Sequence, residues 1–168
     1  KIDSIGDYIL FRNFLEILKN SVRYKDTICD LLTTKAVKGI PEYLDSKYLS
    51  HIFYIQHPFW KLTSIDQYKE LKKLIKEGLG TSYDEIIFPS VNVSNYILFY
   101  VMLTILISSS EYIIQFGDIE PTEGTCTYFR FFTKVISNLN CKDNFEFINN
   151  KNFFQKLTGD KIYLNIPF

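Results

Sequence analysis

The hydrophobic pattern of the chain is dominated by residues 86–110, a segment without a single charged side chain. Its core is the nearly unbroken apolar run 96–107. A helix that is apolar on every side is stable only inside a protein core or a bilayer. A membrane span needs about 20 apolar residues, whereas runs of about 10–14 are typical of buried core helices. We therefore predict no transmembrane segment and a central core helix over residues 93–115, with Leu103 and Leu106 fully buried.

Helical periodicity also marks segments on both sides of this run. In residues 3–22 the apolar positions recur every three or four residues, which predicts an amphipathic helix of about five turns. Ser64 and Gln67 form a capping box that opens another helix, which ends at Gly78 or Gly80. A loop bearing a proline then leads into the central helix. Four further helices are predicted over residues 26–32, 42–56, 122–139 and 143–159, and the alternating tail over residues 162–166 is predicted to be extended.

Together these elements predict an all-α fold in one domain, residues 1–168: a bundle of about seven short helices around the central hydrophobic helix. A domain of this size buries roughly 70% of the surface that its unfolded chain exposes, so it needs neither a metal nor a disulfide to fold. The 15 Phe and 12 Tyr residues supply a bulky core.

The charge balance argues against nucleic acid as a partner. The chain has nineteen basic and nineteen acidic residues, and only three of the basic residues are arginines. The four lysines of residues 69–76 are interleaved with acidic residues, which is typical of a solvated helix face. Three widely spaced cysteines form neither a disulfide framework nor a metal-binding pair, so we expect a cytoplasmic protein. They are Cys29, Cys126 and Cys141.

No local arrangement of residues predicts catalysis or metal binding. His51 and His57 are the only histidines, and they are six positions apart, whereas a metal pair on a helix needs a spacing of about four. The acidic pairs at 84–85 and 118–120 precede predicted helices, where the helix dipole favours carboxylates. We predict no enzymatic activity, no cofactor and no metal. A cysteine and a histidine that meet only in space remain an open alternative.

Phe59 and Trp60 lie outside the regular helical stripes, directly after His57 and Pro58. Aromatic side chains displaced from a core stripe serve in some proteins as anchors for a partner. The alternative is that both rings fold back and cover the core.

Residues 4–13 resemble the opening helix of the poxviral Bcl-like family. Members of that family often carry an acidic residue, Tyr, Ile, a variable position, an aromatic residue, Arg and Asn in this order. The matching residues here are Asp7, Tyr8, Ile9, Leu10, Phe11, Arg12 and Asn13. Four further features agree with this resemblance: the length of the chain, the number of predicted helices, the hydrophobic fifth helix, and an amino-acid composition typical of an AT-rich genome. Two features depart from the family: Phe11 replaces the usual Trp, and the Tyr-Gly segment after the second helix is absent.

The resemblance implies a Bcl-like fold and a non-enzymatic viral modulator that inhibits apoptosis or innate immune signalling proteins in the host-cell cytoplasm. Its partner would be a host protein or amphipathic helix peptide in a groove beside the central helix, or a second copy of the chain. The partner-binding residues are then Tyr8, Phe11, Arg12, Phe59, Trp60 and Phe99. The alternative to the groove is a flat face of the first and sixth helices. Arg12 is expected at the rim of that face, where Arg12→Lys weakens the interface and leaves thermal stability nearly unchanged. The alternatives are a helical subunit or fragment of a larger viral assembly, and a small enzyme whose residues converge in space.

Overall fold

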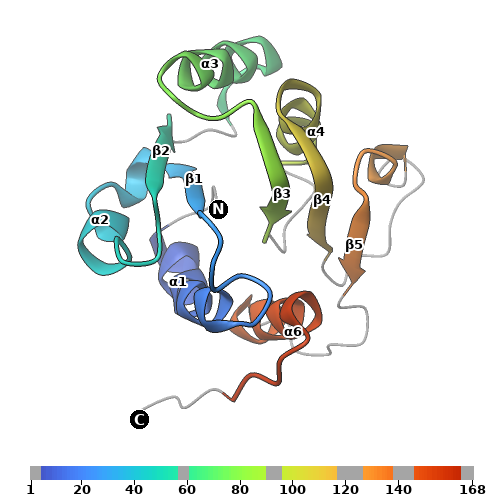
Figure 1. The fold of residues 1–168 in the computed structure, drawn as a ribbon. Helices are drawn as coiled ribbons and strands as arrows, with labels where there is room; N and C mark the ends of the chain where they lie inside the picture. Colours follow the sequence, from blue (N-terminus) through green and yellow to red (C-terminus); the bar gives the residue numbers. More distant parts are fainter. Residues whose placement is uncertain (1–4, 57–60, 90–95, 117–126, 138–145, 164–168) are drawn as a thin grey trace.

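The computed structural model describes residues 5–56, 61–89, 96–116, 127–137 and 146–163, and the following account concerns these ranges. Helices and strands alternate along much of the chain (Figure 1). The elements are α1 (Ile5–Asn20), β1 (Asp30–Thr34), the short 3-10 helix η1 (Lys35–Val37), α2 (Ile40–Leu44), β2 (His51–Ile55), α3 (Ser64–Lys76), β3 (Ser82–Phe88), α4 (Ile97–Leu106), β4 (Ser108–Phe116), β5 (Lys134–Ser137) and α6 (Glu146–Thr158).

The strands form two parallel sheets. One contains β1 and β2, and the other has the order β3-β4-β5. Parallel neighbours require a crossover connection, and α2 connects the first pair while α4 connects β3 to β4. The predicted all-α bundle of about seven helices is therefore wrong, and so is the Bcl-like fold that the resemblance implied.

The largest error concerns the central helix predicted over residues 93–115, because the described part of this segment is a helix followed by a strand. It divides at Ser108 into α4 and β4. Periodicity does not distinguish a short buried helix from a strand that is buried on both faces, since both are continuous apolar runs. In β4, Ile113 and Ile114 point to opposite faces and are both fully buried. The loop predicted before the central helix is the strand β3.

Three other predicted helices are also wrong in part. The segment 26–32 enters β1, 42–56 contains the end of α2 followed by β2, and 122–139 contains β5. By contrast, α1, α3 and α6 lie where the periodicity predicts helices. The cap of α3 is Thr63 rather than Ser64, and its side chain accepts a hydrogen bond of 3.2 Å from the Asp66 backbone N–H. Most of the tail 162–166 lies outside the described residues.

The core consists of two hydrophobic clusters. One contains buried residues of α3 and α4, and the other contains buried residues of α1 and α6. Ile113 of β4 belongs to the second cluster and Ile114 to the first, so β4 separates the two. Figure 1 shows α3 above the strands and α1 and α6 below them. None of the helices within the described ranges combines the length and hydrophobicity that crossing a bilayer requires.

Helix α4 lies on one side of a sheet and is not the centre of a bundle. Leu103 is buried, as predicted, but Leu106 is only partly buried. Leu98 and Ile105 are 50% and 67% exposed, and the helical repeat places them on one outer stripe. The apolar helix therefore has a face that contacts solvent.

Arg12 and Tyr8 join α1 to the end of α2 through Asp45. The Asp45 carboxylate is completely buried and accepts a hydrogen bond of 2.8 Å from the Tyr8 hydroxyl. It also accepts two bonds from Arg12, of 2.8 Å from Nη2 and 3.2 Å from Nε. Burial, and secondarily the bond to Asp45, raises the pKa of the Tyr8 hydroxyl far above its ordinary value. This buried ionic cluster gives Arg12 a role inside the fold.

We expect Arg12→Lys to lower the free energy of unfolding by about 1–3 kcal/mol, because lysine cannot reproduce the two-pronged contact and Asp45 loses a partner. The measurement is the midpoint of urea unfolding. Arg130→Lys, at an exposed arginine, is the control and is expected to change the free energy by less than about 0.5 kcal/mol. Equal midpoints for the Arg12 variant and the wild type would show that Arg12 is only a rim residue.

Leu103→Ala and Leu98→Ala form a matched pair on α4. The first substitution removes buried methyl groups and is expected to destabilise the protein by about 2–5 kcal/mol. The second acts at a half-exposed position, and the same change there is expected to have less than half that effect. Urea unfolding of both variants tests the orientation of α4. A larger loss of stability in Leu98→Ala than in Leu103→Ala would contradict this orientation.

Candidate functional site

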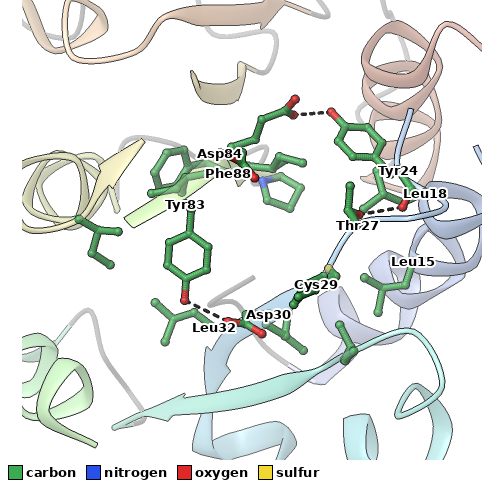
Figure 2. A pocket seen from close by; sticks show the side chains of 18 of the residues that line it. Leu15, Leu18, Tyr24, Thr27, Cys29, Asp30, Leu32, Tyr83, Asp84 and Phe88 are labelled. Carbon is green, nitrogen blue, oxygen red and sulfur yellow. Dashed lines mark hydrogen bonds between the residues drawn. The ribbon is translucent and has the colours of Figure 1, made fainter. Parts of the chain in front are cut away.

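A cavity of about 720 Å³ lies between the two sheets, where β1 and β3 contribute to its walls (Figure 2). Both strands pair with a sheet partner on one side only among the described residues: β1 with β2, and β3 with β4. We call this cavity the crevice. Its volume falls within the range of about 300–1,000 Å³ that is typical of sites for small molecules.

The inner wall of the crevice is apolar. The helical spacing of α1 places Phe11, Leu15 and Leu18 on one face, and all three line the crevice. Phe99 and Leu103 of α4 line it as well, and each of these five side chains is buried. The wall is therefore apolar, and it is made by two helices that belong to different core clusters.

The rim is polar and comes from the loop before β1 and from the start of β3. Its carboxylates and its single guanidinium group belong to residues Asp26, Asp30, Asp84, Glu85 and Arg23. The Arg23 Nη2 atom lies 2.7 Å from Glu85 and 3.1 Å from Glu111. The Tyr24 hydroxyl donates a 2.7 Å hydrogen bond to the other Glu85 oxygen. Burial, followed by this bond, raises the pKa of Tyr24. Both oxygens of Glu85 are therefore already bound by neighbours within the chain.

Asp30 is the least exposed of the four carboxylates in the crevice lining, with only 16% of its side chain exposed. The register of β1 and β2 places it opposite His51, whose Nδ1 atom lies 2.9 Å from Asp30 Oδ1. The hydroxyl of Tyr83 donates a 3.1 Å hydrogen bond to Oδ2 (Figure 2). Two donors from two different strands thus hold the Asp30 carboxylate at the crevice.

Tyr83 is in turn held by Gly80. The hydroxyl oxygen of Tyr83 accepts a 3.1 Å bond from the Gly80 backbone N–H. A Cβ atom at position 80 would lie 3.1 Å from the Tyr83 ring, closer than most contacts of this kind, so glycine permits the approach. Burial is the main cause that raises the pKa of Tyr83 to about 12, so its hydroxyl is a neutral donor at pH 7.

Cys29 lines the crevice beside Asp30 and is partly buried. Burial, opposed only in part by the charge of Lys19, raises the pKa of its thiol above the ordinary value. The nucleophile in cysteine chemistry is the thiolate, and a raised pKa disfavours it at pH 7. The Nδ1 atom of His51 contacts the Asp30 carboxylate, so His51 forms an Asp–His pair. Cys126 and Cys141 lie outside the described residues, and the Cys–His pair left open by the sequence stays a prediction. The described residues contain no group of three or more metal-ligating side chains.

The structure brings only two of the residues assigned to partner binding into this site. Phe11 and Phe99 line the crevice wall, whereas Tyr8 and Arg12 lie in the Asp45 cluster. Phe59, Trp60 and His57 lie outside the described residues. The partner-binding role of these residues stays a prediction, and the burial of Tyr8, Phe11 and Phe99 leaves little of them available at the surface.

Asp30, Tyr83 and the role of His51 were not predicted from the sequence. Asp30 lies 21 residues from His51 and 53 from Tyr83, so no local spacing signals that they meet. Comparisons of the chain with protein-family models, curated proteins and solved structures found no match. The resemblance to the poxviral Bcl-like family is thus neither supported nor refuted by a relative, and the site must be interpreted from its own chemistry.

The raised pKa of Cys29 predicts slow alkylation. In a Cys126→Ser/Cys141→Ser variant, Cys29 is the only thiol, and its rate with neutral iodoacetamide follows the thiolate fraction. We expect the pH at half-maximal rate to lie above that of the same chain unfolded in urea, because folding stabilises the neutral thiol. A lower midpoint in the folded protein would instead indicate an activated cysteine.

Proposed function

We propose that this chain is an α/β domain that binds a small organic molecule in the crevice. The observation that carries the proposal is a cavity of about 720 Å³ with a buried apolar wall and a polar rim. Small-molecule sites combine such apolar walls with a few converging polar groups that fix the orientation of the ligand. Here the converging groups are the Asp30 carboxylate and the Tyr83 hydroxyl, which lie 3.1 Å apart.

The chemistry of the lining supports binding rather than a reaction. Burial disfavours the thiolate form of Cys29, and the Tyr83 hydroxyl stays neutral at pH 7. Glu85 is bound to Arg23 and Tyr24, so it is poorly suited to act as a general base. We therefore assign the crevice the role of a receptor site and assign it no catalytic step.

The observed fold does not support the helix-binding groove that the Bcl-like resemblance implied. A groove for an amphipathic helix was expected in an all-helical bundle, and the parallel sheets replace that bundle. Inhibition of a host signalling protein stays an untested prediction without support from the architecture. Membership of a larger assembly is likewise untested.

Ser82→Trp is expected to obstruct the crevice with little loss of stability, because Ser82 is an exposed residue of its lining and tryptophan is favoured in strands. The probe is the neutral apolar dye Nile red. The wild type is expected to bind one equivalent, and Ser82→Trp is expected to weaken binding at least about tenfold, or ~1.4 kcal/mol. Fluorescence titration measures both affinities.

Ser110→Trp is the matched control, since Ser110 is an exposed strand residue outside the crevice lining. It is expected to leave dye binding unchanged. In the single-cysteine variant, bound dye is also expected to slow alkylation of Cys29. Absence of saturable binding, or equal weakening by both tryptophan variants, would overturn the proposal.

A further inference from the structure

The crevice lining carries an excess of negative charge in addition to its apolar wall. Four carboxylates but only one guanidinium group belong to the lining. The whole chain has a formal net charge of zero, so this excess of negative charge, offset in part by Lys19 near Cys29, is local. The single guanidinium, Arg23, is paired with Glu85 and Glu111. An anionic ligand would therefore meet repulsion and no uncommitted arginine in the described lining.

Asp30 is the group that distinguishes this cavity from an ordinary apolar pocket. Its carboxylate is largely buried, and its two bonds come from an imidazole and from a neutral phenol. An ionised carboxylate has about four acceptor positions, so two donors leave room for further hydrogen bonds. Burying a charge is costly unless it is paired, so a cation that reaches Asp30 would be bound more strongly than one at an exposed carboxylate.

The surroundings of Asp30 suit an organic ammonium group better than a bare metal ion. The described residues gather no set of three metal-ligating side chains. Aromatic residues line the crevice on the β3 side, among them Tyr83 and Phe88, and aromatic faces attract organic cations. Figure 2 shows the Asp30 and Tyr83 side chains pointing toward one another, and Leu15 and Leu32 belong to the lining of the same cavity. Charge and apolar surface are thus placed within one cavity.

We infer that the ligand of the crevice is an amphiphilic amine, whose ammonium group pairs with Asp30 and whose hydrocarbon body packs on the apolar wall. The inference rests on the proposed binding function. Tyr83 and His51 are positioning residues that hold the carboxylate from β3 and β2. The inferred class comprises molecules with one amine and a short aliphatic or aromatic body, rather than phosphates, nucleotides or fatty acids.

Three probes with the same six-carbon body separate charge from hydrophobicity: hexylammonium, 1-hexanol and hexanoate. Their affinities are measured by displacement of Nile red from the wild type. We expect hexylammonium to bind at least about tenfold more tightly than 1-hexanol, and hexanoate to bind more weakly than both. Added salt should reduce the advantage of the amine while leaving 1-hexanol unaffected.

Asp30→Asn keeps the shape of the side chain and removes its charge, and it is expected to abolish the advantage of hexylammonium over 1-hexanol. Asp160→Asn is the control, because Asp160 is an exposed carboxylate outside the crevice lining. It is expected to leave the ratio of affinities within about twofold. If Asp30→Asn does not fold, the salt dependence of the wild type decides the question.

The outcomes separate the two proposals. Equal affinities for hexylammonium and 1-hexanol, or an amine preference that survives in folded Asp30→Asn, would overturn the assignment of an amine while leaving small-molecule binding intact. If neither Nile red nor any six-carbon probe binds, the proposed small-molecule binding function itself is overturned.

Discussion

Side-chain hydrogen bonds across the crevice, rather than a strand ladder, connect the two parallel sheets in the described part of the chain. Tyr83 of β3 donates to Asp30 of β1, and Tyr24, from the loop before β1, donates to Glu85 of β3. Backbone pairing would bring neighbouring strands to about 5 Å and close the space between them. Side chains span a wider gap and need to meet only at their ends. The cavity is therefore a direct consequence of how the sheets are joined.

The helices keep this arrangement stable by burying both sides of β4. The α1–α6 cluster contains Ile113, and the α3–α4 cluster contains Ile114. Buried apolar residues of every strand belong to one of these two clusters, so apolar contacts reinforce the hydrogen bonds of the rim. The Arg12–Asp45 contact adds a separate polar link between α1 and the end of α2.

The sequence predicts those parts of the structure whose side chains alternate between water and core with a helical period. Helices α1 and α3 have one polar face, and both lie where the periodicity predicts them. Strand β4 was missed because its apolar residues are consecutive and buried on two faces, and β3 was missed because the acidic pair at 84–85 indicated a loop. The site was missed for a different reason: Asp30, His51 and Tyr83 meet only through strand register and sheet placement. Phe11 and Phe99 were singled out, but their place in a crevice between parallel sheets was not foreseen.

The most direct test of the crevice as a ligand site is an NMR titration of the isotope-labelled protein with 1-hexanol, which does not depend on the charge of the ligand. Binding in the crevice predicts saturable shifts for the methyl groups of Leu15, Leu18 and Leu103. The methyl groups of Leu98 and Ile105, on the solvent-exposed stripe of α4, are expected to remain unchanged. Shifts confined to Leu98 and Ile105, or no saturable shift at all, would contradict the account.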